Sequence, residues 1–289
     1  GKVFDRAVIA PDVNDEIGFQ GTAFTGVVDD EGHTVLNLAI TRRSHLGLFG
    51  RLGSWSASAT FKNLGVVTVN ITGSGDYIGG LVGINTGDAT KCFSTGTISG
   101  DESIGGLTGS NSGDITQCFS AAFVSGVSEI GGLSGSNHGG ATISRCYAAC
   151  TVLADDRAGG LVGVNAGISG SGRGGGSYIS HVAIVSDCYS IVLSGSHVSG
   201  LLVGENGRDS GMYPCPSLIK NCYASCEGSE MLTPVALVGH NWLLAAATVL
   251  DCFWDAECSG VVDDAEGGAP KTTAELQIAS TFHRWRGCG

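Results

Sequence analysis

One glycine-rich pattern recurs six times along this 289-residue chain and constrains its fold more than any other feature. The copies share Leu-x-Gly-x-Asn and span 79–85, 105–111, 131–137, 159–165, 200–206 and 235–241. A cysteine and an aromatic residue follow each copy, at Cys92-Phe93, Cys118-Phe119, Cys146-Tyr147, Cys188-Tyr189, Cys222-Tyr223 and Cys252-Phe253. Two weaker copies, with Leu38 and Leu64 at the cysteine position, bring the total to about eight repeats.

The spacing within the repeat places all length variation in one segment. From each cysteine to the next motif leucine the distances are 15, 15, 15, 14 and 15 residues. From each motif asparagine to the next cysteine they are 7, 7, 9, 23, 16 and 11 residues. Stacked repeats must keep their strands in register, so insertions are tolerated only at a corner that faces water. We therefore expect loops to leave the fold after each asparagine.

The segments between glycines are too short for helices and have the composition of strands. Residues 66–71 and 95–99 are rich in β-branched side chains and lack a helical apolar period over ten or more positions. Glycine contributes 48 residues, which indicates frequent turns. The sequence predicts an all-β, right-handed parallel β-helix of about eight coils. Parallel strands then stack about 4.8 Å apart, and equivalent residues form ladders along the axis.

Three ladders follow from this stacking. We expect the glycines to mark a bend that requires positive φ or close backbone approach, at Gly83, Gly109, Gly135, Gly163, Gly204 and Gly239. We expect the asparagines to bond local backbone or one another at a turn, at Asn85, Asn111, Asn137, Asn165, Asn206 and Asn241. The cysteines are expected to be small buried hydrophobes, at Cys92, Cys118, Cys146, Cys188, Cys222 and Cys252.

The repeat resembles that of bacterial surface proteins with the GLUG motif, roughly GGLVGxN, a variable segment, then NCYATGxVSG. Residues 24–38 resemble the introductory coil of that family, with Asp30 and Glu31 replacing a Gly-Asn pair. FWDAECSG at 253–260 and KTTAELQ at 271–277 resemble its terminal element, which implies a short helix capped by Thr272 or Thr273. We divide the chain into N-terminal coils at 1–45, solenoid repeats at 46–252 and a capping segment at 253–289.

Charge and hydropathy exclude some partners. The formal net charge is -12 and the fifteen Lys and Arg residues are scattered, which argues against nucleic acid. No apolar stretch is long enough to span a membrane, and the first residues lack the layout of a signal peptide. Because the resemblance implies secreted or surface-anchored proteins, we expect an extracellular or cell-surface location and a chain that continues upstream of Gly1.

No constellation of catalytic or metal-ligating residues emerges from the sequence. Acidic pairs fall at turns, where they are usually solvated, and the histidines lack metal-ligand spacing. The glycine-rich stretch 170–177 lacks the ending of a phosphate-binding loop. We expect no catalytic residue, metal ligand or cofactor. Weak binding of structural calcium at the acidic turns is the alternative, although no ligand loop of defined spacing supports it.

The two longest insertions, 166–187 and 207–221, leave the same corner of neighbouring coils and should lie side by side. Aromatic and arginine side chains on adjacent loops are typical of a recognition patch. The binding patch predicted on these loops consists of Arg173, Tyr178, His181, Arg208, Asp209, Met212 and Tyr213. The alternative is that these loops only decorate the scaffold, because insertions there cost little.

Five cysteines lie off the ladder. Cys258 stands where the family has threonine and Cys288 lies in the tail, which suggests a Cys258–Cys288 disulfide. Cys150 and Cys226 lie two coils apart, about 9.6 Å, beyond disulfide reach. The sequence leaves Cys215 as free, bonded to another loop cysteine or an intermolecular link.

These observations lead to a non-catalytic structural or adhesive solenoid, such as a building block of a surface layer, filament or adhesin. Its partner would be another copy of itself, end to end or laterally, or a glycan or protein at a cell surface. The alternative is a β-helix that binds or cleaves polysaccharide, which requires carboxylates or aromatic rings aligned across coils. Ice binding would need persistent threonine rows, and Thr95 and Thr97 give way to Ala121 and Ala122 in the next repeat.

Overall fold

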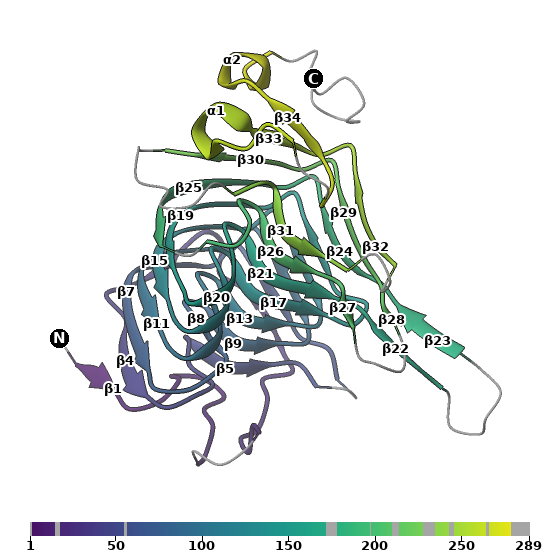
Figure 1. Cartoon of the computed structure of the whole chain (residues 1–289). Coiled ribbons are helices and arrows are strands. Elements are labelled where there is room, and N and C mark those ends of the chain that lie inside the picture. The colour runs from purple at the N-terminus through teal and green to yellow at the C-terminus, as the bar shows by residue number, and fades with distance from the viewer. Residues whose placement is uncertain are drawn as a thin grey trace.

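The chain winds into a stack of parallel coils (Figure 1). The computed structural model describes residues 2–14, 18–54, 57–171, 178–196, 198–209, 214–227, 235–242, 246–263 and 266–278. Each coil contributes one strand to each of up to four sheets, and every pairing between coils is parallel among these residues. The predicted all-β parallel solenoid is confirmed.

One coil visits the four sheets in a fixed order. Starting at Ile78, the chain passes through a four-stranded, a seven-stranded, an eight-stranded and an eleven-stranded sheet, then enters the next coil. The four-stranded sheet contains β8 (Ile78–Gly79), β12 (Glu102–Gly105), β16 (Ser128–Gly131) and β20 (Asp156–Gly159). The seven-stranded sheet contains β5 (Phe49–Leu52), β9 (Val82–Asn85), β13 (Thr108–Asn111), β17 (Ser134–His138), β21 (Val162–Ala166), β26 (Val203–Asn206) and β31 (Val238–Asn241).

The other two sheets form the remaining faces. The eight-stranded sheet contains β2 (Val27–Asp29), β6 (Thr60–Lys62), β10 (Asp88–Thr90), β14 (Asp114–Thr116), β18 (Thr142–Ser144), β24 (Ala183–Ser186), β29 (Ser217–Lys220) and β32 (Ala247–Leu250). The eleven-stranded sheet contains β1 (Val3–Phe4), β3 (Thr34–Leu36), β4 (Ala39–Arg42), β7 (Gly65–Gly73), β11 (Phe93–Ser99), β15 (Phe119–Ser125), β19 (Tyr147–Leu153), β25 (Tyr189–Ser196), β30 (Tyr223–Cys226), β33 (Phe253–Asp255) and β34 (Ala269–Lys271). The eight-stranded sheet has one strand from each coil, which agrees with the predicted number of about eight coils.

The asparagine ladder is a continuous row of side-chain hydrogen bonds. Each Nδ2 donates to the Oδ1 of the asparagine in the next coil, at 2.7, 2.8, 2.8, 2.9 and 2.9 Å from Asn85 to Asn241. All six side chains are buried. Several also bond local backbone, as where Gly87 N donates to Asn85 Oδ1. Both bonding modes expected for this ladder therefore occur together.

The cysteine ladder is buried, as predicted, and its thiols also take part in hydrogen bonding. The Cys92 backbone N–H donates to Cys118 Sγ at 3.3 Å, and Cys118 N donates to Cys146 Sγ at 3.4 Å. Each of the six ladder cysteines, and Leu64 at the equivalent position, is preceded by a residue in the left-handed region: Asn63, Lys91, Gln117, Arg145, Asp187, Asn221 and Asp251. This corner turns the backbone N–H away from the regular ladder, and sulfur accepts it.

The glycine ladder reflects close backbone approach and not positive φ. A Cβ on Gly83 would lie 2.7 Å from the carbonyl oxygen of Gly50 and 2.8 Å from that of Tyr77. The six ladder glycines are absent from the positive-φ residues of the described chain. Of the two reasons expected for glycine here, the structure supports close approach.

One assignment near the N-terminus was wrong. Leu64 does occupy the cysteine position, because Phe93 pairs with Gly65. Leu38 does not, because Thr34 pairs with Gly65 and the residue beside Leu64 is therefore His33. The cause is β7, whose nine residues pair with both β3 and β4, with a break at Asn37. Leu38 is buried farther along the same sheet.

A substitution within the asparagine ladder tests whether this row stabilises the stack. Asn137→Ala removes the acceptor for Asn111 and the donor for Asn165, leaving two buried polar groups unsatisfied. We expect a loss of about 2–5 kcal/mol in the free energy of unfolding, measured by urea denaturation. Asn70→Ala, at an exposed strand position, is the matched control and should change it by less than about 0.5 kcal/mol. Equal effects would contradict a stabilising role for the ladder.

Candidate functional site

The two long insertions form antiparallel hairpins that project side by side from one corner of the stack (Figure 1). One consists of β22 (Ile168–Ser171) and β23 (Tyr178–His181), the other of β27 (Arg208–Asp209) and β28 (Pro214–Cys215). Their bases are linked, because Gly167 N donates to the carbonyl oxygen of Pro216 at 3.0 Å. This corner joins the seven-stranded and eight-stranded sheets, where the spacing predicted insertions.

The seven residues of the predicted binding patch have different surroundings. Arg173, Met212 and Tyr213 lie outside the described residues. Tyr178 begins β23 and Asp209 ends β27, and nothing further is described of their side chains. His181 ends β23 and is exposed. Arg208 is committed to an ion-pair network, so of the two patch side chains whose exposure is described, His181 is the freer to meet a partner.

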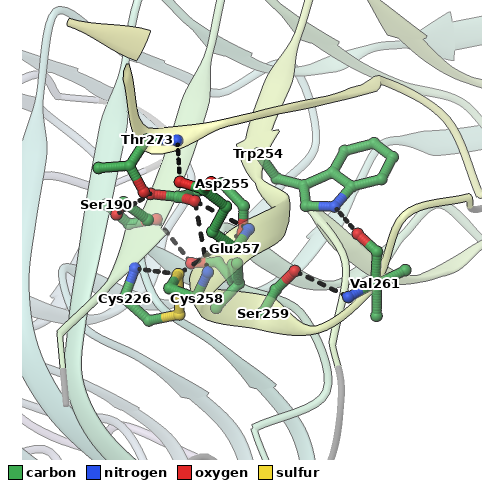
Figure 2. Close-up of a disulfide and its surroundings, with 11 residues drawn as sticks. Ser190, Cys226, Trp254, Asp255, Glu257, Cys258, Ser259, Val261 and Thr273 are labelled. Carbon is green, nitrogen blue, oxygen red and sulfur yellow. Dashed lines mark hydrogen bonds between the residues drawn. A yellow bond between two sulfur atoms is a disulfide. The ribbon is translucent and has the colours of Figure 1, made fainter. Parts of the chain in front are cut away.

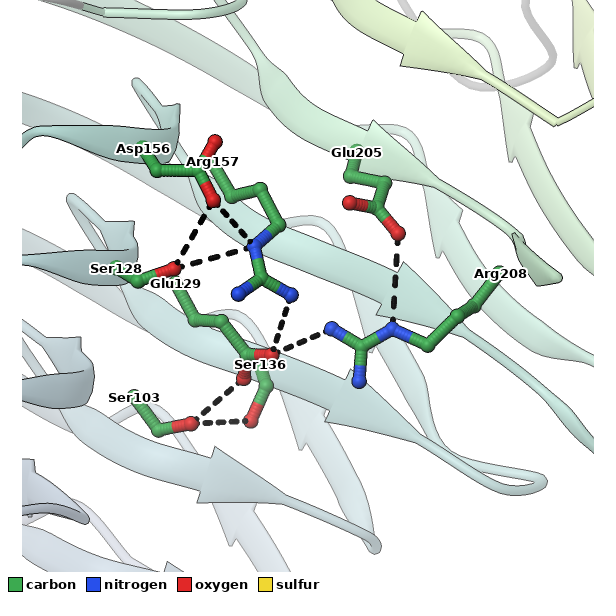
Figure 3. Close-up of polar contacts among 8 residues, drawn as sticks. All are labelled: Ser103, Ser128, Glu129, Ser136, Asp156, Arg157, Glu205 and Arg208. Atoms are coloured by element: carbon green, nitrogen blue, oxygen red, sulfur yellow. Dashed lines mark hydrogen bonds and ion pairs between the residues drawn. The ribbon is translucent and has the colours of Figure 1, made fainter. Parts of the chain in front are cut away.

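The network around Arg208 lies where the four-stranded and seven-stranded sheets meet (Figure 3). Arg208 forms an ion pair with Glu129 of β16 and a second with Glu205 at 3.6 Å. Arg157 of β20 reaches the same Glu129 oxygen at 3.3 Å. Ser103 Oγ, from β12, donates to its other oxygen at 2.7 Å. Four successive coils are thereby joined through one carboxylate.

Glu129 is the most buried charged group in this network. Its side chain is 5% exposed, against 29% for Arg157 and 36% for Arg208. Burial alone would raise the pKa of Glu129, but hydrogen bonds from Arg208 and Ser103 outweigh it and lower the pKa. A carboxylate held ionised by two guanidinium groups is poorly suited to act as a general acid. Its geometry is that of a buried anchor for the base of the second hairpin.

Two further carboxylates occupy the neighbouring row of the same corner. Burial, with the nearby charge of Asp101, raises the pKa of Asp76. Glu102 is exposed, but partial desolvation of its carboxyl, with the nearby charges of Glu129 and Asp76, raises its pKa as well. The row continues through Ser128, which pairs in register with Glu102, and through Asp156, which pairs in register with Ser128. Acidic side chains are therefore aligned across coils, an arrangement that sequence spacing did not reveal because the column combines Asp, Glu and Ser.

A stack of aromatic rings follows the outer face of the eleven-stranded sheet. The rings of Phe93, Phe119, Tyr147, Tyr189 and Tyr223 lie 4.9, 4.9, 4.9 and 5.1 Å apart between centroids, with interplanar angles of 2–9°. All five residues are half-buried. Because their faces contact one another, the ring edges form the accessible part of the row. The Cys-aromatic pairs in the sequence signal this stack.

A disulfide joins the last coils to the C-terminal cap, but it is not the predicted one (Figure 2). Cys258 is bonded to Cys226, with a Cα–Cα distance of 5.7 Å, which excludes the Cys258–Cys288 pairing. Cys288 lies outside the described residues. Cys226 follows ladder Cys222 by four residues and Cys258 follows Cys252 by six. The helical turn α1 (Ala256–Ser259) advances less per residue than a strand and so brings these positions together.

The cap itself has the expected helix and one that was missed. Helix α2 (Thr273–Leu276) is capped by Thr272 in a reciprocal box with Glu275, as the resemblance implied. Helix α1 was not predicted, although Asp255 before it and Gly260 after it are typical caps. Asp255 also accepts a hydrogen bond from Thr273 Oγ1 at 2.8 Å, which joins the two helices.

Two other off-ladder cysteines lie within the described residues, and neither is in a disulfide. Cys150 is free and buried, and Cys215 is free and half-buried. Within the described ranges no three His, Cys, Asp or Glu residues gather as a metal site. Over the same ranges, no helix has the length and apolar character needed to cross a membrane.

Comparison with known proteins gives one partial similarity. A stretch of 82 residues, 28% of this chain, is 37% identical to Halomucin of Haloquadratum walsbyi strain DSM 16790 / HBSQ001. The matched stretch is 1% of the length of Halomucin. No family model matches the chain, so the GLUG resemblance stays a prediction. No solved structure matches it either.

Loss of the disulfide should destabilise the cap. For a 32-residue separation, chain entropy predicts that Cys258→Ser lowers the free energy of unfolding by about 3–4 kcal/mol, measured by thermal or urea denaturation. Peptide mapping without reduction should find Cys226 linked to Cys258. Cys150→Ser, which alters a free buried cysteine, controls for loss of a thiol and should leave that linked peptide intact. A peptide joining Cys258 to Cys288 would refute the pairing.

The ion-pair network should make stability depend on pH. The pKa of Glu129 in the folded state lies below its ordinary value of 4.5, so its contribution is present above pH 4.5 and is lost as pH falls through the folded pKa. At pH 7, Glu129→Gln should lower the free energy of unfolding by about 2–3 kcal/mol, and the difference from wild type should shrink in acid. Glu102→Gln removes an exposed carboxyl of raised pKa and should not destabilise at pH 7. A pH-independent Glu129→Gln effect would contradict the account.

Proposed function

We propose that this chain is a non-catalytic structural or adhesive module at the outer surface of a cell. The observation that carries the proposal is the repeated hydrogen-bonded core, in which the residues shared by all six motif copies build the stack. The motif asparagines, glycines and cysteines are all buried or in close backbone contact. Residues free to vary lie on the outer faces and in the hairpins, as suits a scaffold that displays loops.

The similarity to Halomucin is compatible with a place at the cell surface. The matched segment is a small part of a very long protein, as suits one module among many. The disulfide Cys226–Cys258 supports an oxidising compartment, because such bonds persist outside the reducing cytosol. The GLUG resemblance adds adhesins as a class in which to place the module.

Surface labelling tests the location and the role together. Intact cells of the source organism are treated with a biotin reagent that does not cross membranes, and the chain is recovered with an antibody. We expect biotin on surface lysines such as Lys91, which is exposed. A cytosolic protein serves as the control for cell integrity. Biotin on this chain only after lysis would refute the surface proposal.

A second candidate, carbohydrate binding, is favoured by the aligned aromatic rings and carboxylates. The ring edges of Tyr147, Tyr189 and Tyr223 recur once per coil and present hydroxyl groups in a row. A glycan array with the purified chain tests this candidate, with Tyr147→Ala and Tyr189→Ala together as the matched variant. Binding lost in the variant would favour it, and release of reducing ends from a bound polysaccharide would make the chain an enzyme.

A further inference from the structure

Asn70 is the one asparagine of this chain that begins an Asn-x-Thr sequence, Asn70-Ile71-Thr72. This tripeptide, with any residue except proline in the middle, is the acceptor for N-linked glycans. The chain has eleven asparagines, so the sequence match alone says little. The surroundings of each asparagine decide whether Asn70 differs from the rest.

Nine of the other ten asparagines have a structural role in the stack or at its corners. Six form the buried ladder described above. Asn37, Asn63 and Asn221 adopt the left-handed conformation at corners, which asparagine tolerates better than most residues. Asn14 has an interaction of its own near the N-terminus. Asn70 lies in the middle of β7, and no side-chain hydrogen bond involves it in the described part of the chain.

A central strand position is an unusual place for an unbonded asparagine. Asparagine is depleted in strands, and its neighbours Val69 and Ile71 are β-branched and buried. Strand alternation places Asn70 and Thr72 on the outer face of the sheet, and both are exposed. Fold stability therefore gives no reason for asparagine here, whereas a modification acceptor would require it.

The space around Asn70 can accommodate a bulky group. Its in-register neighbours are Ala39 on one side and Thr97 on the other, both small. The inserted hairpins leave the stack between the seven-stranded and eight-stranded sheets, whereas β7 belongs to the eleven-stranded sheet. Figure 1 shows β7 on the far side of the stack from β23. A glycan at this position would project into solvent without displacing core or loop.

We propose that Asn70 is an N-linked glycosylation site. The donor is an oligosaccharide on a lipid diphosphate carrier. The bond between sugar C1 and the carrier phosphate oxygen breaks, and a bond forms between C1 and the Asn70 amide nitrogen. The nitrogen loses one proton to a base of the transferring enzyme, the carrier leaves as lipid diphosphate, and no group is oxidised or reduced. The site rests on the proposed function, because export exposes the chain to such an enzyme.

Translation of the full chain with an added signal peptide, in the presence of microsomes, tests the acceptor independently of natural location. These membranes supply both the transferring enzyme and the lipid-linked donor. We expect one glycan on the wild type, seen as a single gel shift removed by an endoglycosidase. Thr72→Ser should keep the shift, whereas Asn70→Gln and Thr72→Val should abolish it. Both side chains are exposed, so circular dichroism should show all variants folded.

The outcomes separate this site from the surface proposal. An unshifted wild type, or an Asn70→Gln variant that still shifts, would overturn the site whatever the cell-labelling result. A glycosylated wild type that loses its β-sheet spectrum would also overturn it, because the fold would not tolerate the group. Chain labelled on intact cells with an unmodified Asn70 peptide by mass spectrometry would refute the site and leave the surface role standing.

Discussion

The in-register pairing of parallel strands from one coil to the next is the constraint on which this structure depends. Once Phe93 pairs with Phe119, and Phe119 with Tyr147, every equivalent side chain falls into a column. A column works only if its side chain can contact a copy of itself, as asparagine, cysteine and aromatic rings do here. Repetition in the sequence is therefore a consequence of geometry, and length can vary only where the chain leaves the sheets.

The predictable part of the fold is the part governed by this repetition. The strand class, the number of coils, the buried ladders and the corner for insertions all followed from motif spacing. Leu38 was misplaced because the first coil pairs two short strands with one long one, which breaks the period. The Cys226–Cys258 bond was missed because α1 changes the rise per residue within a single coil. Local departures from the repeat are thus where spacing misleads.

The candidate site shows a second limit of sequence reasoning. Arg208 was chosen as an arginine on one of two adjacent loops, yet its guanidinium is paired with Glu129, 79 residues away in sequence. No local pattern marks Glu129 as a buried partner, since its neighbours in the column are Ser103 and Arg157. Columns of hydrophobic or amide side chains repeat the same residue type, so a single sequence predicts them. A charge network uses a different residue in each coil, so only the three-dimensional structure reveals it.

The asparagine row has a direction. Every amide donates toward the C-terminal end, so the dipoles add along the axis and the row is electrically polar. In the preceding coil, the position of the first member, Asn85, is occupied by Leu52. The leucine side chain can neither donate nor accept a hydrogen bond, so the row ends there. At the opposite pole, Asn241 lies against the carboxylate of Glu266, which accepts its backbone N–H. The molecule thus has an anion at the positive pole of its internal dipole, as helices have at their amino ends.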